Sequence, residues 1–173
     1  MSTPAVLTLE ALNRADRETF RVWLGDVFEA SPWVAERAWE ARPFRTVEAL
    51  HAAMRAVVTR ASDGERLALL RAHPDLAGKA ARAGAMSAAS VAEQATAGLD
   101  RLTDDEFARF ERLNGTYRER FGFPFIVAVR RHDKLAILAA YERRLQNTRE
   151  GEIEAALEQV FEITGLRLAA RVR

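Results

Sequence analysis

The sequence contains no cysteine, so neither its folding nor its chemistry depends on a thiol. This absence excludes disulfide bonds, zinc sites built from thiolates and a thiol nucleophile. A strong charge of either sign is also absent, because 26 basic and 25 acidic residues leave a formal net charge of +1. Such a balance argues against a nucleic-acid partner and against binding to an acidic membrane surface.

Long apolar runs are absent as well. No stretch approaches the roughly 20 apolar residues that a membrane-spanning helix requires. Residues 1–18 lack the basic segment followed by an apolar segment that marks a signal peptide. We therefore expect a cytoplasmic protein with no membrane partner. The length suits one compact domain over residues 1–173.

Apolar residues recur with helical spacing along most of the chain, which predicts an all-α fold. Between residues 16 and 29, for example, the apolar stripe from Phe20 to Phe28 predicts one continuous helix. Polar residues with the preferences and spacing of N-caps predict where other helices begin. These predicted starts are Ser31, Thr46, Ser62 with Glu65, Ser90 with Glu93, Thr103 with Glu106, Asp133 and a position near Thr148.

The segment FGFPFIVAVR (residues 121–130) is the exception to the helical pattern. Gly122 and Pro124 interrupt the helix before it, and the run that follows is continuously apolar. We expect one extended buried apolar segment near residues 122–130 within a single multi-helix domain. Its backbone groups outside helical bonding would need partners, which a ligand rich in amide groups could supply.

His73 is the first candidate for chemistry and one of three histidines in the sequence. The proline that follows it ends a helix, so we expect an exposed imidazole at a fixed helix terminus. Histidine exchanges protons near neutral pH, and the negative end of a helix favours the imidazolium, as a general acid requires. The simpler alternative is a histidine that only caps the last carbonyl groups of the helix.

Glu93, with Gln94 beside it, has two interpretations. Ser90 and Glu93 have the spacing of a capping box, in which the carboxylate only bonds back to the Ser90 amide. The same helix start would also offer backbone N–H groups and the positive end of a dipole, which together bind an anionic or carbonyl ligand. The spacing leaves both open.

A metal site is the weaker alternative for these residues. His73, Asp75 and Glu93 could supply ligands, but a catalytic zinc normally has three protein ligands, and no paired-histidine motif such as HExxH is present. We therefore expect no metal.

Three segments in combination resemble one family. HPDLAGKA, SVAEQATAGLD and FGFPFIVAVR, in this order, are similar to the 2-oxo-4-hydroxy-4-carboxy-5-ureidoimidazoline (OHCU) decarboxylases, which perform the last step from urate to (S)-allantoin. SPWVAERAW, RLQNTREGEI and ITGLRL resemble the same family, so the similarity covers almost the whole chain. It implies an all-helical, cofactor-free enzyme that acts on a small molecule and is commonly a homodimer.

The resemblance also implies roles for individual residues. His73 and Glu93 would be catalytic. The residues that would bind substrate are Pro74, Ser90, Val91, Ala92, Gln94, the segment Phe125, Ile126, Val127, Ala128 and Val129, and Arg167, with Arg130 as a second candidate for the arginine that some members use.

The substrate class explains why no cofactor is expected. The carboxylate to be lost sits on a carbon that also bears a hydroxyl, and the neighbouring ring carbon belongs to a C=N bond that can accept the electron pair. With this electron sink in the substrate, neither pyridoxal phosphate nor thiamine is needed. We expect His73 to deliver the proton, and Glu93 and Gln94 to form hydrogen bonds with the substrate. The alternative is a non-enzymatic helical ligand-binding or interaction domain of the same fold.

Overall fold

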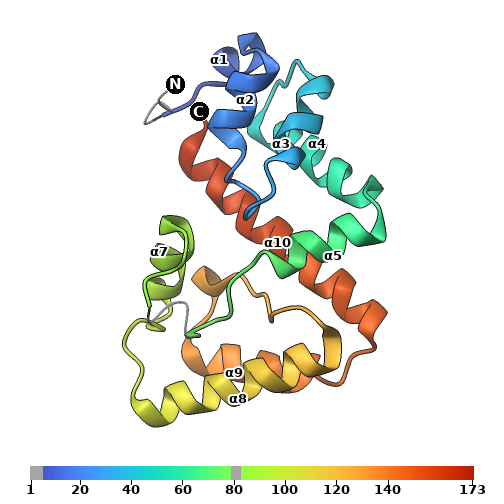
Figure 1. Cartoon of the computed structure of the whole chain (residues 1–173). Coiled ribbons are helices and arrows are strands. Elements are labelled where there is room, and N and C mark those ends of the chain that lie inside the picture. The colour runs from blue at the N-terminus through green and yellow to red at the C-terminus, as the bar shows by residue number, and fades with distance from the viewer. Residues whose placement is uncertain (1–5, 79–82) are drawn as a thin grey trace. The chain divides into compact units, whose positions relative to one another are not determined.

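The computed structural model describes residues 6–78 and 83–173, most of which are helical (Figure 1). The α-helices are α1 (Leu9–Arg14), α2 (Arg17–Leu24), α3 (Trp33–Ala38), α4 (Val47–Arg60), α5 (Asp63–Arg71), α7 (Ala88–Thr96), α8 (Asp104–Phe121), α9 (Lys134–Arg144) and α10 (Arg149–Arg171), and the 3-10 helices are η1 (Trp39–Ala41) and η2 (Val129–Arg131). The described residues contain no strand beyond an isolated bridge between Leu7 and Val172. The predicted all-α class is confirmed. No helix in these two ranges is long and apolar enough to cross a membrane.

Most of the predicted helix starts are confirmed. Thr46 and Asp133 each accept a hydrogen bond from the backbone N–H three residues ahead. The capping boxes at residues 62–65 and 103–106 are both complete. α10 begins directly after Thr148. These side chains satisfy backbone N–H groups that the first turn of a helix leaves without partners.

The prediction of one continuous helix over residues 16–29 is wrong. α2 ends before Gly25, where a Cβ atom would lie 2.5 Å from the carbonyl oxygen of Arg21. Phe28 is nevertheless fully buried, because the chain turns inward after the helix ends. Apolar residues in a turn can thus continue a helical pattern without being helical.

Two smaller differences occur near the N-terminus. α3 begins one residue later than predicted, with Pro32 at its N-cap, and the Ser31 hydroxyl donates to the carbonyl of Glu29. The short helix α1, whose N-cap is Thr8, was not among the predicted elements. Its single buried residue, Leu12, gives too little periodicity to predict a helix.

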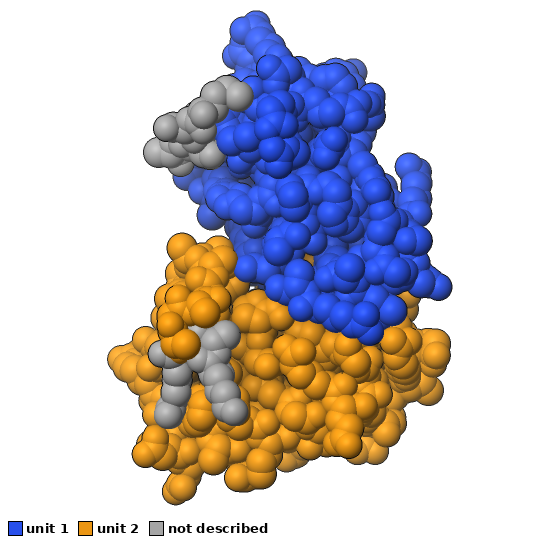
Figure 2. Space-filling model, viewed as in Figure 1, with its two compact units in different colours: residues 1–72, 161–173 blue, residues 73–160 orange. Residues whose placement is uncertain are grey.

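The chain folds into two compact units, which Figure 2 shows in different colours. Unit 1 comprises residues 1–72 and 161–173, and unit 2 comprises residues 73–160. α10 therefore belongs to both units, since it leaves unit 2 at residue 160. Within unit 1, Phe161 meets Phe28 edge-on with ring centroids 6.5 Å apart, so α10 packs on the turn that follows α2.

Aromatic side chains form the core of unit 2. The rings of Tyr117, Phe121, Phe123, Phe125 and Tyr141 are almost completely buried. Phe125 stacks on Tyr141 with ring centroids 3.7 Å apart, and Tyr117 meets Phe123, Phe125 and Tyr141 edge-on. Stacked and edge-on pairs both suit the charge distribution of aromatic rings, so this cluster fixes α8, α9 and the segment between them.

The extended buried segment predicted near residues 122–130 is confirmed. α8 ends at Gly122, whose φ of +82° lies in the left-handed region that glycine adopts without strain. Residues 123–129 are all buried, and the chain is not helical again until η2. An irregular backbone is thus carried through the interior of unit 2, where its polar groups require defined partners.

Candidate active site

His73 follows directly after Ala72, the C-cap of α5, as predicted. Its side chain, however, is buried, since only 7% of the residue is exposed, and the prediction of an exposed imidazole is wrong. The reason is that residues 76–78 turn into the interior of unit 2 and do not run along its surface. A buried imidazole has a defined environment, but its replacement also removes packing.

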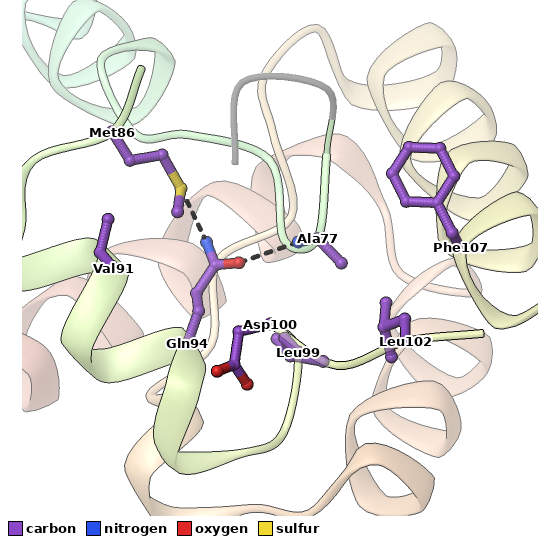
Figure 3. A pocket seen from close by; sticks show the side chains of 8 residues that line it. All are labelled: Ala77, Met86, Val91, Gln94, Leu99, Asp100, Leu102 and Phe107. Carbon is purple, nitrogen blue, oxygen red and sulfur yellow. Dashed lines mark hydrogen bonds between the residues drawn. The ribbon is translucent and has the colours of Figure 1, made fainter. Parts of the chain in front are cut away.

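The loop after His73 is held by Gln94 from α7. The Oε1 atom of Gln94 accepts a hydrogen bond from the Ala77 N–H at 2.9 Å, and its Nε2 atom lies 3.4 Å from the Asp75 carbonyl oxygen. Nε2 also faces the sulfur of Met86 at 3.4 Å (Figure 3). The amide of Gln94 thus bonds the loop that follows His73, and its predicted contact with substrate stays a prediction.

Two side chains of α8 also hold this loop. The Nδ2 atom of Asn114 donates to the Leu76 carbonyl at 2.9 Å. The Arg118 guanidinium pairs with the Asp75 carboxylate at 2.9 Å. Lys79 and Ala80, the last residues of the HPDLAGKA segment, lie outside the described residues. Every position from Asp75 to Ala77 is therefore bonded to a helix of unit 2, which restrains the loop next to His73.

α7 begins earlier than the sequence indicates. Its N-cap is Ser87, whose hydroxyl oxygen accepts the N–H of Ser90 at 3.2 Å, so the prediction that Ser90 caps this helix is wrong. Serines at both positions can cap, and the earlier one adds most of a turn of helix. Glu93 consequently lies inside the helix, and the capping-box interpretation of its carboxylate does not hold.

The buried face of α7 carries three of the predicted site residues. Ser90, Glu93 and Gln94 are 5%, 8% and 5% exposed, which is unusual for polar side chains and requires polar surroundings. Val91 and Ala92, by contrast, are exposed. Ser90, Glu93 and Gln94 have the helix spacing of three and four residues and form a buried polar face, while the other two predicted residues of this helix are exposed.

The backbone of the segment 125–129 is held by two side chains of unit 2. Arg144 Nη1 donates to the Ile126 carbonyl at 2.5 Å, and Gln159 Oε1 accepts from the Ala128 N–H at 3.0 Å. We predicted that a ligand could satisfy such groups, but for these two the protein itself supplies the partner. The segment is thereby fixed before any ligand binds.

Arg144 is in turn held by a buried carboxylate. Glu152 is fully buried and accepts from Arg144 Nε at 2.7 Å and from Asn147 Nδ2 at 2.8 Å. The Tyr117 hydroxyl donates to the same carboxylate, and burial together with this bond raises the pKa of Tyr117. The guanidinium also lies 4.4 Å from the centre of the Phe125 ring. Sequence reasoning missed this cluster, and its one signal was the RLQNTREGEI segment, which carried no assigned role.

The three predicted site segments thus meet within unit 2. Gln94 joins α7 to the loop after His73, and α7 packs against η2, which begins at Val129. His73 and Glu93, which belong to two of these segments, are both buried, and histidine and glutamate side chains can each exchange protons with a ligand.

Comparison with known proteins identifies the family. A family model described as OHCU decarboxylase matches residues 13–169, which include parts of both units. The chain belongs to the OHCU decarboxylase family.

Individual OHCU decarboxylases and related proteins are similar over most of this chain. The OHCU decarboxylase of Haloferax volcanii is 48% identical, covering 95% of this chain and 96% of that protein. The uric acid degradation bifunctional protein PucL of Bacillus subtilis is 40% identical, but this chain spans 32% of its length. The family resemblance inferred from the three segments is therefore confirmed.

Solved structures agree with the fold. The crystal structure of an (S)-allantoin synthase superimposes with a TM-score of 0.77 at 36% identity, covering 96% of this chain and 54% of that one. A crystal structure of an OHCU decarboxylase in the presence of (S)-allantoin has a TM-score of 0.69 at 22% identity, covering 90% of this chain and 96% of that one. The second likeness shows the shared fold alone.

The two arginines considered for the OHCU decarboxylase site differ in their surroundings. Arg167 lies in unit 1, where it is 8% exposed, donates to the Val27 carbonyl at 3.1 Å and pairs with Glu29 at 3.1 Å. Arg130 is exposed on η2 in unit 2. A substrate contact by Arg167 stays a prediction.

A pocket of about 390 Å³ lies beside α7 in unit 2 (Figure 3). It is mostly apolar, and its lining residues are Ala77, Met86, Val91, Gln94, Leu99, Asp100, Leu102 and Phe107. Among these described lining residues, the one charged group is the carboxylate of Asp100, which would repel the carboxylate of an OHCU molecule. In the described part of the chain, no group of three or more histidine, aspartate or glutamate side chains could hold a metal ion.

Proposed function

We propose that this protein decarboxylates OHCU to (S)-allantoin in urate breakdown, without a cofactor. The observation that carries the proposal is the meeting of the His73 loop, the buried face of α7 and the segment 125–129 in unit 2. The H. volcanii relative, similar along nearly its whole length, supports the reaction. The solved (S)-allantoin synthase supports the handedness of the product.

The reaction requires one proton and no external electron acceptor. The bond between the ring carbon and its carboxylate breaks, CO₂ leaves, and the electron pair moves into the neighbouring C=N bond. The nitrogen of that former C=N bond takes up a proton, a second proton adds to the carbon that bears the ureido group, and the hydroxyl on the other carbon loses its proton as it becomes a carbonyl. One proton is taken up overall, and the face to which it adds sets the handedness of allantoin.

His73 is the proton donor in this proposal. The backbone just after it, from Asp75 to Ala77, is bonded to α7 and α8, which supports a restrained position for His73. A restrained donor in a buried site adds its proton to one face of a bound intermediate. Pro74, directly after it, lies beside the substrate.

Glu93 and its neighbours orient the substrate. The carboxylate of Glu93 accepts hydrogen bonds from the ring and ureido N–H groups of OHCU, with Ser90, Gln94 and the backbone of Val91 and Ala92 around it. The segment Phe125–Val129 supplies shape and backbone contacts. Arg167, as a cation, is assigned to a substrate oxygen or carboxylate. A homodimer, a cytoplasmic location and one functional domain over residues 1–173 belong to the same proposal.

The test generates OHCU in situ from urate and follows allantoin by circular dichroism. Protein dialysed against a strong chelator is expected to accelerate product formation and to give (S)-allantoin in excess, because one fixed donor protonates one face. Uncatalysed decay in the same buffer, the control, should give both hands. Formation of both allantoin enantiomers at the background rate would refute the proposed decarboxylase function. Activity lost with the chelator and restored by a metal ion would refute the cofactor-free mechanism.

Glu93→Gln separates catalysis from structure. The substitution preserves shape and removes the charge, so the protein should stay folded, and kcat/KM should fall about 10²-fold or more because a charged acceptor is lost from the site. Glu106→Gln is the matched control, since Glu106 forms a true capping box with Thr103 and glutamine retains that geometry. Wild-type activity in folded Glu93→Gln protein would remove Glu93 from the mechanism.

A further inference from the structure

A buried asparagine connects the loop after His73 to the core of unit 2. Asn114, in α8, is 3% exposed, and its Nδ2 atom donates to the Leu76 carbonyl at 2.9 Å. Its Oδ1 atom accepts a hydrogen bond from the hydroxyl of Tyr141, in α9. The asparagine therefore uses both ends of its amide, one toward the loop and one toward α9. Polar groups at this depth contribute chiefly by fixing one arrangement of their partners.

Tyr141 connects this bond to the second site segment. Its ring is fully buried and stacks on Phe125, with centroids 3.7 Å apart and an angle of 18° between the planes. Burial raises the pKa of Tyr141, so its hydroxyl keeps its proton and can donate to Asn114. One side chain thus packs on the segment 125–129 and, through Asn114, reaches a carbonyl three residues after His73.

We propose that Asn114 and Tyr141 are positioning residues that set the His73 loop relative to the segment 125–129. The proposal rests on the decarboxylase function proposed above. Neither residue is assigned a contact with substrate. They hold the Leu76 carbonyl in place, and this position determines the direction from which His73 approaches the intermediate. A displacement of a catalytic group by about 1 Å can cost about 10²-fold in rate, so a bond this close to the donor affects turnover.

Tyr141→Phe is the main test, because it removes one hydroxyl and keeps the ring that stacks on Phe125. We expect kcat per folded molecule to fall about 10-fold or more, with KM within about threefold of wild type, since the substrate contacts remain. The excess of (S)-allantoin in the product should also fall, measured with enough enzyme that the catalysed rate is far above the rate of uncatalysed decay. Asn114→Asp tests the other half of the bridge, since it keeps an acceptor for Tyr141 and removes the donor to Leu76.

Thr164→Val is the control for loss of a buried hydroxyl. Thr164, in unit 1, is 1% exposed, and its hydroxyl forms hydrogen bonds with the His51 ring and the Phe161 carbonyl. Its replacement should therefore lower stability without changing kcat. Folded Tyr141→Phe and Asn114→Asp proteins with wild-type kcat and wild-type product handedness would overturn the positioning role alone. If Tyr141→Phe does not fold, the kcat of Asn114→Asp decides. Wild-type protein without activity on OHCU would overturn the proposed function and this inference together.

Discussion

His73→Asn is expected to lower kcat by about 10²–10⁴-fold, the usual range for loss of a general acid or base. Asparagine retains one hydrogen-bonding amide near the position of a ring nitrogen but cannot release a proton at neutral pH. Because His73 is only 7% exposed, the variant also loses buried ring atoms. Thermal unfolding by circular dichroism must therefore accompany the rate measurement, so that kcat refers to folded protein.

His132→Asn is the matched control for this substitution. His132 is half-buried and follows η2, and it has no role in the proposed chemistry. Its replacement should leave kcat close to the wild-type value. Folded His73→Asn protein that turns over OHCU at nearly the wild-type rate would exclude His73 as the proton donor.

Arg144→Leu is expected to lower the free energy of unfolding by about 3–5 kcal/mol, the cost of removing one partner from a buried ion pair. The carboxylate of Glu152, which is fully buried, would lose the guanidinium that it pairs with. The Ile126 carbonyl would lose its donor at the same time. Urea unfolding, with the midpoint and slope both measured, gives this change directly.

Arg143→Leu provides the comparison, since Arg143 is the exposed neighbour on the same helix. Its replacement should change the free energy of unfolding by no more than about 0.5 kcal/mol. Arg144→Leu combined with Glu152→Gln should recover part of the loss, because no unpaired charge is then buried. Equal destabilisation by Arg144→Leu and Arg143→Leu would mean that the buried pair does not stabilise this fold.

Helix starts set by one cap residue could be predicted, because a cap is decided within four residues. Thr46, Asp133 and the capping boxes at residues 62–65 and 103–106 all follow from such local chemistry. The start of α7 could not be predicted, since Ser87 and Ser90 offer the same chemistry. The choice between them depends on burial of one face of α7, which is a property of the tertiary structure.

The segments that form the candidate site could be predicted from the sequence, but the side chains that hold these segments in place could not. Burial of His73 depends on how the chain returns after Pro74, which no local pattern specifies. Asn114 reaches Leu76 across 38 positions of sequence. The pair formed by Arg144 and Glu152 spans the turn between two helices, so neither helix shows it by its own periodicity. Contacts of this kind arise only when separate elements pack.

Unit 1 needs both ends of the sequence, and this sets the order in which a growing chain acquires its structure. Its N-terminal helices emerge early, but Leu7 exchanges hydrogen bonds with Arg171 and Arg173, and Phe28 packs on Phe161. Residues 73–160 contain all of unit 2, so that unit is complete in sequence before unit 1 is. On the ribosome the later-synthesised unit can therefore finish first, the reverse of the usual order from the N-terminus. Until the last turns of α10 are made, Leu7 and Phe28 lack the partners that these turns supply.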